Sequence, residues 1–174
     1  MSVASLLTST YLRKWAKEPT EGQKKAGNYK KGHRKILGMD VSIENPAHSV
    51  RRGTDPDGNE WETRMFSHYG YFKRTEGKDK DHVDCFIKLG MKPSKVSKIF
   101  IVNQKDPKTG EFDEHKVMIG WPSKSEAKRG YLANYDRGWR GIQSIVGCSV
   151  DQFKDWVYDK SKTKKPADPN DFKE

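Results

Sequence analysis

Short runs in which apolar and polar residues alternate occupy the first two thirds of the chain and predict β-strands. Residues 36–44 alternate loosely and run into Asn45-Pro46, which is typical of a strand that ends in a turn. The runs 49–53 and 61–66 flank turn-forming residues and therefore predict a hairpin. Similar runs predict four more strands, at residues 69–72, 83–89, 96–103 and 117–121.

Helix signals come later in the chain. Two capping boxes, Ser123 with Glu126 and Ser149 with Gln152, begin helices that we expect to extend to about residues 138 and 158. A short amphipathic helix is also expected ahead of Pro19. Strands followed by helices predict an α+β fold.

The length of 174 residues, of which 33% are hydrophobic, suffices for one domain with its own core. No apolar run approaches the length of about 18 residues that a membrane span requires, and the segment around Leu6 is too short for a signal-peptide core. We therefore expect a soluble, cytoplasmic protein. Cys85 and Cys148 are too few for a disulfide scaffold and lack metal-ligand spacing, so both are expected to be reduced packing residues.

The net charge of +10 is concentrated near the N-terminus. Residues 13–35 contain nine Lys or Arg against two Glu, whereas residues 36–158 carry only +2. We therefore divide the chain into a basic arm at 1–32, a domain at 33–158 and a flexible tail at 159–174. The arm suits a phosphate-rich partner such as nucleic acid, and it suits equally well a role in keeping the protein in solution.

The strongest candidate for chemistry is an acidic turn between two predicted strands. Asp79 and Asp81 lie on the connection, and Asp84 begins the strand that follows. Such a turn can gather three carboxylates around one point, where their repulsion favours a hard divalent cation such as Mg²⁺ or Mn²⁺. The pattern alone fits a solvated acidic turn or a Ca²⁺-stabilised loop as well. A second acidic cluster, at residues 111–114, precedes Lys116.

The residues of this turn resemble the signature of the soluble, Mg²⁺-dependent inorganic pyrophosphatases. Residues 79–84 follow its D-x-D-[PE]-hydrophobic-D pattern except at Lys80 and at His82, and Tyr69 stands ten residues ahead of Asp79, as the tyrosine of that family does. Other stretches resemble even more closely a pyrophosphatase-like domain of bacteriophage and mobile-element polyvalent proteins: residues 26–33, 42–46, 112–118 and 134–139.

This resemblance, which covers about residues 20–158, implies a fold and a set of site residues. The implied fold is a small, closed, mainly antiparallel β-barrel of the OB-like kind, flanked by two C-terminal helices, with the acidic site at its mouth. The expected metal ligands are Asp79, Asp84, Asp106, Asp113 and Glu44, with Glu114 as the alternative to Asp113. Asp81 is expected to accept the proton of the attacking water. The residues expected to hold phosphate are Arg51, Arg64, Tyr69, Lys116 and Tyr135.

The implied reaction is hydrolysis of inorganic pyrophosphate or a related phosphoanhydride by a metal-activated water, with Mg²⁺ or Mn²⁺ as the cofactor. Two other functions fit the same residues. One is a phage virion or nucleic-acid-associated protein that keeps the fold without turnover, and the other is hydrolysis of a nucleotide. Histidines beside the acids, namely His68, His82 and His115, also fit a Zn²⁺ or Mn²⁺ site. The sequence leaves the oligomeric state and a host or phage origin open.

Overall fold

The computed structural model describes residues 32–173. The helix predicted ahead of Pro19 and the basic arm predicted at 1–32, apart from its last residue, lie outside the described residues. Within residues 32–173, no helix combines the length and the apolar character that a membrane span requires.

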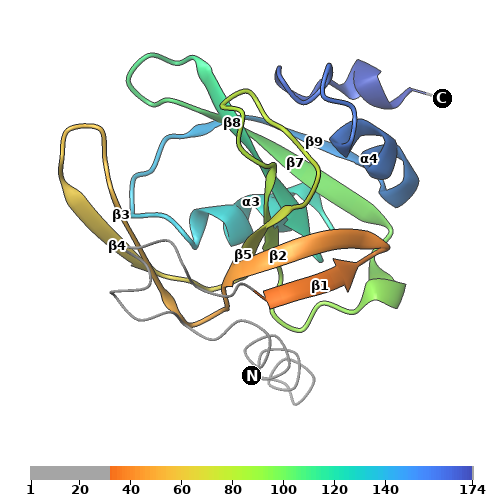
Figure 1. Ribbon diagram of the computed structural model, residues 1–174, viewed down its shortest axis with the longest axis horizontal. Helices are drawn as coiled ribbons and strands as arrows, with labels where there is room; N and C mark the ends of the chain where they lie inside the picture. The colour runs from red at the N-terminus through yellow and green to blue at the C-terminus, as the bar shows by residue number, and fades with distance from the viewer. Residues whose placement is uncertain (1–31, 174) are drawn as a thin grey trace.

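A mixed sheet of seven strands forms the centre of the molecule (Figure 1). Its strands are, in spatial order, β1 (Gly32–Ile36), β2 (Met39–Asn45), β5 (His68–Phe72), β6 (Asp84–Ile87), β8 (Phe112–Ile119), β7 (Lys98–Lys105) and β9 (Ile142–Ser149). All neighbouring strands are antiparallel except β6 and β8, which are parallel. After β6 the chain passes through a short 3₁₀ helix, η1 (Pro93–Lys95), and forms β7, and β8 then returns antiparallel to β7 in the position between β6 and β7. This parallel pair sets Asp84 opposite Lys116.

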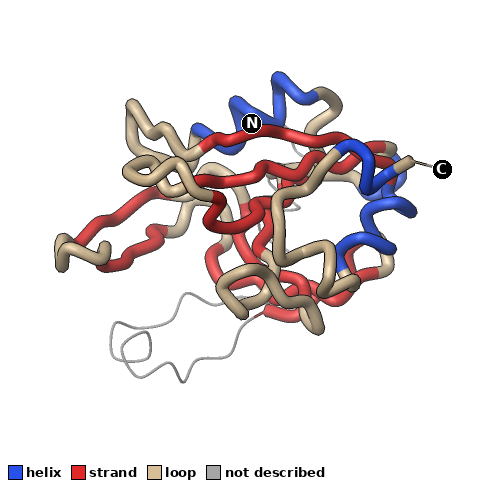
Figure 2. Tube along the Cα trace, turned by 90° about the horizontal axis from the view of Figure 1, so that it is seen from above, coloured by secondary structure: helices blue, strands red, loops and turns tan. Residues whose placement is uncertain are grey.

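A separate two-stranded hairpin projects from the body of the molecule (Figures 1 and 2). It consists of β3 (Val50–Thr54) and β4 (Glu60–Arg64), as the sequence predicts. Gly53 lies against the ring of Trp61, where a Cβ would come within 2.3 Å of a ring carbon. Only glycine therefore allows Trp61 to lie flat across the hairpin.

The two faces of the sheet bury two different cores. On one face, α3 (Lys124–Leu132) covers an aromatic and apolar cluster that includes Phe86, Met118 and Tyr131. On the other face, α4 (Val150–Val157) packs Phe153 and Trp156 against the sheet. Ser123 and Ser149 cap these helices through their side chains, which confirms both predicted helix starts.

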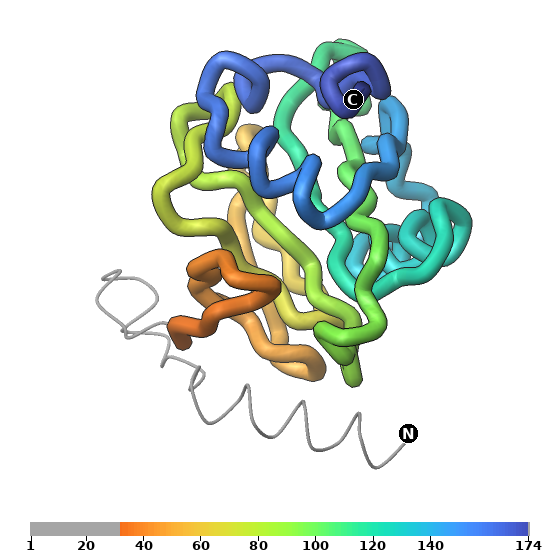
Figure 3. Tube along the Cα trace, turned by 90° about the vertical axis from the view of Figure 1, so that its right-hand side faces the viewer, coloured from red at the N-terminus to blue at the C-terminus, as the bar shows by residue number. Residues whose placement is uncertain are grey.

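Residues 159–173 pack on the same face as α4 (Figure 3). The chain here ends in a second 3₁₀ helix, η2 (Pro169–Phe172), whose Phe172 packs on Trp156. Asn103 of β7 donates to the carbonyl of Ala167 (2.9 Å) and accepts from its N–H (2.8 Å). The composition of this segment predicts a flexible tail, and the structure instead shows a packed C-terminal strap, because the strap supplies partners for polar groups that the sheet buries.

The α+β class is correct, whereas a closed barrel is not confirmed. Within residues 32–173, the edge strands β1 and β9 do not pair with each other, so the sheet stays open. The helix α4 packs against one face of this open sheet. Its Phe153 contacts Phe72 of β5, and its Trp156 contacts His115 of β8.

Candidate functional site

A buried ammonium group is the centre of the candidate site. The side chain of Lys116 is 3% exposed, and its Nζ donates to Asp84 Oδ2 (2.7 Å) and to the hydroxyl of Tyr69 (2.9 Å), and forms an ion pair with Glu114 Oε1 (2.8 Å). Glu114 precedes Lys116 by two residues in β8, so both side chains point to the same face of the sheet. The parallel partner β6 brings Asp84 to the same point.

The charges of this centre compensate one another. Burial alone would lower the pKa of Lys116, but the nearby charges, first that of Asp84, raise it well above its ordinary value. Lys116 therefore stays protonated at neutral pH. Burial raises the pKa of the Glu114 carboxyl, and the ammonium of Lys116 opposes this effect. The centre thus holds a positive charge out of water by means of two carboxylates.

The projecting hairpin contributes an arginine to this centre. The guanidinium of Arg51 lies 4.3 Å from the ring centroid of Tyr69 and 5.1 Å from that of Trp61, and its Nη2 donates to the Tyr69 hydroxyl (3.4 Å). Tyr69 in turn donates to Asp84 Oδ2 (2.5 Å). Two cations, Arg51 and Lys116, therefore flank one phenol, as a site for an anion requires.

A second group of hydrogen bonds extends from Glu114 to the region after α3. Gln104 of β7 donates to Glu114 Oε1 (3.2 Å) and accepts from the hydroxyls of Tyr131 (2.6 Å) and Tyr135 (2.9 Å). Trp139 donates to the Tyr131 hydroxyl (2.8 Å) and stacks on Tyr135. The sequence predicts site roles for Glu114 and Tyr135 but not for Gln104, Tyr131 or Trp139. The spacing of Tyr131, Tyr135 and Trp139, four residues apart each time, is a signal that could have found the aromatic group.

The acidic turn lies beside this centre. The Asp81 N–H donates to Asp79 Oδ1 (3.1 Å), and the Asp81 carbonyl accepts from the N–H of Gly77 (2.8 Å). Burial raises the pKa of Asp79, and the negative charges of Asp81 and Asp84 act in the same direction. Lys78 donates to the carbonyl of Phe112, which fastens the turn to the start of β8. Asp79 therefore interacts electrostatically with both other carboxylates of the turn.

Four other residues that the sequence predicts for the site make no hydrogen bond to Lys116 among the described residues. Arg64 is exposed and donates to the carbonyl of His48 (3.1 Å). Asp106 accepts from the N–H of Lys108 (2.8 Å) in the β7–β8 turn, and Asp113 is exposed at the start of β8. Glu44 is half-buried near the end of β2 and interacts electrostatically with Cys85.

The three histidines lie in different parts of the structure. His68 accepts from the N–H of Ala47 (2.9 Å), and His82 stacks on Tyr71 and contacts the carbonyl of Thr75. His115 lies on the opposite face of the sheet from Lys116, where it contacts the carbonyl of Lys165 (3.0 Å). Each ring thus has a local structural contact.

A complete metal cage is absent from the described part of the chain, residues 32–173, where no three His, Cys, Asp or Glu side chains form a metal-binding group. The donor chemistry nevertheless fits a hard cation. Among the described residues, Asp84 Oδ1 and Glu114 Oε2 take no part in the contacts to Lys116, Tyr69 and Gln104. Mg²⁺ usually keeps several waters and binds one or two carboxylates together with substrate phosphates. Two carboxylates with free oxygens beside an acidic turn meet this requirement.

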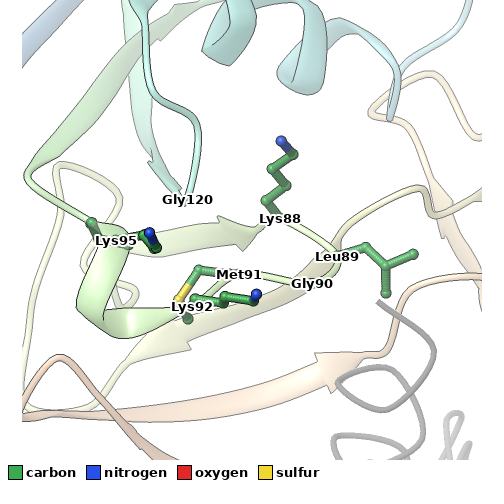
Figure 4. A pocket seen from close by; sticks show the side chains of 8 residues that line it. Lys88, Leu89, Gly90, Met91, Lys92, Lys95 and Gly120 are labelled. Atoms are coloured by element: carbon green, nitrogen blue, oxygen red, sulfur yellow. The ribbon is translucent and has the colours of Figure 1, made fainter. Parts of the chain in front are cut away.

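A pocket of about 320 Å³ lies elsewhere, at the ends of β6 and β8 remote from Asp84 and Lys116. Three of its lining residues are lysines, but Figure 4 shows the side chain of Lys88 pointing away from Lys92 and Lys95. These ammonium groups do not converge on one point. The pocket is therefore separate from the candidate site.

Comparison with known proteins identifies the family. The family model described as inorganic pyrophosphatase matches residues 21–158. Among solved structures, the chain is similar to an inorganic pyrophosphatase from Coxiella burnetii, with 16% identity over 80% of this chain and 99% of the other and a TM-score of 0.38. It is also similar to an inorganic phosphatase from Anaplasma phagocytophilum, with 21% identity over 53% of this chain and 60% of the other and a TM-score of 0.25. No curated protein sequence matches. Because the family match spans most of the chain and includes Asp84, Glu114 and Lys116, the chain belongs to the inorganic pyrophosphatase family.

Proposed function

We propose that this protein hydrolyses inorganic pyrophosphate, and that the reaction takes place at the centre formed by Lys116, Asp84 and Glu114. The observation that carries the proposal is the buried ammonium of Lys116, which is paired with two carboxylates inside a member of the pyrophosphatase family. An ion pair of this kind is costly to bury and contributes little to stability on its own. A role in binding a phosphate group accounts for its place in the structure.

The cationic and hydroxyl groups of the site bind the substrate in this proposal. Arg51 and Lys116 neutralise the charge of pyrophosphate, and the planar guanidinium of Arg51 can hold two phosphate oxygens at once. The hydroxyls of Tyr69 and Tyr135 are proposed to orient the substrate, which is supported by their hydrogen bonds to Lys116 and Gln104, respectively. Arg64, at the end of the hairpin, is proposed as a further contact.

The carboxylates of the site are proposed to hold Mg²⁺, with Mn²⁺ as a substitute. Asp84, Glu114 and Asp79 are the first candidates, the sequence adds Glu44 and Asp106, and Asp113 is the alternative to Glu114. When bound, a divalent cation neutralises phosphoryl oxygens and makes a water molecule more acidic. Asp81, on the exposed side of the acidic turn, is proposed to accept the proton of that water.

The bond changes are those of a phosphoanhydride hydrolysis. The oxygen of water forms a bond to one phosphorus, and the bond from that phosphorus to the bridging oxygen breaks. The electron pair of the broken bond stays on the leaving phosphate, whose charge Arg51 and Lys116 stabilise. Asp81 receives the proton, and two phosphate ions result.

Phosphate release by the full chain tests the proposal. We expect turnover of pyrophosphate in Mg²⁺ or Mn²⁺, loss of turnover in chelator, and inhibition by Ca²⁺, whose larger and looser shell misplaces the attacking water. The same assay with nucleoside di- and triphosphates decides whether a nucleotide is the better substrate. No phosphate release from any of these compounds contradicts the proposal and favours a protein that keeps the fold without turnover.

A further inference from the structure

Among the described side chains, Gln104 is the one whose hydrogen bonds connect Glu114 with Tyr131 and Tyr135. Its amide nitrogen donates to Glu114, and its amide oxygen accepts from Tyr131 and Tyr135, while the residue itself is only 5% exposed. We propose that Gln104 is a positioning residue that fixes the carboxylate of Glu114 and the hydroxyl of Tyr135 relative to each other. This role rests on the proposed function of the site.

The direction of these hydrogen bonds follows from Glu114. A carboxylate can only accept, so the amide group of Gln104 has to turn its nitrogen to Glu114. The amide oxygen then faces Tyr131, whose hydroxyl donates to it and accepts from the indole N–H of Trp139. The opposite orientation of the amide would set its oxygen against the carboxylate and its N–H groups against two phenol hydrogens.

The strands on both sides of β7 are irregular opposite Gln104. The pairing register shifts between Gln104 and Lys105 on the side of β8, and between Asn103 and Gln104 on the side of β9, because β8 and β9 each contain one extra residue there, Asp113 and Gln143. Such bulges are common next to active sites. Asn103, one residue earlier, points to the other face and bonds Ala167. Gln104 therefore lies between two bulges, one in each neighbouring strand.

The aromatic group behind Gln104 restricts its movement. The ring centroids of Tyr131 and Tyr135 lie 4.6 Å apart, and Tyr135 and Trp139 stack at 5.0 Å with an interplanar angle of 8°. Tyr131 has no hydrogen bond to Asp84, Glu114 or Lys116 among the described residues, and its hydroxyl reaches the site only through Gln104. A change at Tyr131 should therefore affect the reaction through Gln104.

Kinetics of single and double variants test this role. We expect Gln104→Met to lower kcat for pyrophosphate about 10–100-fold while KM changes less than about threefold, because orientation matters most in the transition state. Tyr131→Phe should lower kcat in the same direction by a smaller factor. The double variant should match Gln104→Met, since the two residues act in series. Gln143→Met, at an exposed position of β9, is the matched control and should leave both constants unchanged.

The outcomes separate positioning from a structural role. A melting temperature that falls in Gln104→Met while kcat stays at the wild-type value overturns the proposal, and so do independent, multiplying losses of kcat in the double variant. A second readout needs no turnover: in NMR spectra of the ligand-free protein, one side-chain amide proton of Gln104 should be shifted by its bond to Glu114, and Glu114→Gln should move that signal. A Gln104 amide with the shifts of a free side chain overturns the positioning role, whereas a wild type without turnover overturns the proposed function.

Discussion

Lys116 carries a positive charge at a position where its side chain is 3% exposed, and its partners explain how this is tolerated. Asp84 and Glu114 each supply a carboxylate oxygen, and Tyr69 supplies a hydroxyl, so all three ammonium hydrogens have an acceptor. Removing one partner of such a group leaves a buried charge uncompensated, which typically costs about 3–5 kcal/mol. Conservative changes at the carboxylates are therefore better probes of function than removal of the lysine.

The two adjacent acids of β8 should differ in their effect on activity. Glu114 shares the face of Lys116, whereas Asp113 is exposed at the start of the strand. We expect Glu114→Gln to lower kcat for pyrophosphate at least about tenfold and Asp113→Asn to change it less than about threefold. Steady-state phosphate release by both variants checks this. The reverse order of effects would show that the predicted ligand Asp113 reaches the substrate.

The stability of the protein should depend on pH through His115. Burial lowers the pKa of His115 from 6.5 to about 4, and its Nδ1 has no hydrogen-bond partner among the described residues. The unfolded chain therefore binds a proton between pH 6.5 and 4 that the folded protein does not bind. The free energy of unfolding should fall by up to about 3 kcal/mol as the pH decreases across this window.

Urea unfolding at several pH values measures this effect. His115→Gln removes the titrating ring and should flatten the decrease between pH 6.5 and 4. An equally steep decrease in wild type and variant would show that other groups cause the acid sensitivity.

At the scale of elements, the C-terminal strap gives the clearest prediction. Phe172 is 9% exposed and packs on Trp156, which a flexible tail would not do. We expect Phe172→Ala to lower the free energy of unfolding by about 2 kcal/mol, because a buried aromatic side chain is lost from the core. The exposed neighbour Lys173→Ala is the control. Equal urea midpoints for wild type and Phe172→Ala would contradict a packed strap.

The elements show what alternation can and cannot predict. Strands rich in buried residues, such as β5 and β7, and helices with capping boxes were predictable because the signal is local. β1 and β9 were not, since β1 is rich in polar residues and exposed positions interrupt the alternation of β9. The strap has few apolar residues, and its packing depends on partners such as Asn103 that lie far away in the sequence.

The residues of the candidate site also fall into those that a local sequence signal indicates and those that only the folded structure brings together. The sequence alone points to the acidic turn and to Lys116, because each lies in a short contiguous motif, residues 79–84 and 112–118. The choice of Glu114 as the ion-pair partner of Lys116 depends on the register of β8, which also has a bulge opposite Gln104 and Lys105. Gln104 carries no motif, and only the folded sheet places it between Glu114 and Tyr135.

At the scale of the whole molecule, the two faces of the open sheet differ in character. The face under α4 and the strap is a largely apolar core, whereas the face under α3 combines a core with the ionised centre at Lys116. The projecting hairpin then brings Arg51 over this centre from outside the main sheet. Asp84, Glu114 and Lys116 thus lie on the sheet, whereas Arg51 comes from a separate element.

The most direct test of this account is the kcat for pyrophosphate hydrolysis in Mg²⁺, measured for wild type and for Asp84→Asn. The amide can still accept from Lys116, so we expect the variant to stay folded by thermal melting while kcat falls about 100-fold or more. Asp57→Asn, which changes an exposed ion pair with Lys108, should keep wild-type kcat. Turnover by folded Asp84→Asn at the wild-type rate would contradict the claim that the reaction takes place at the Lys116 centre.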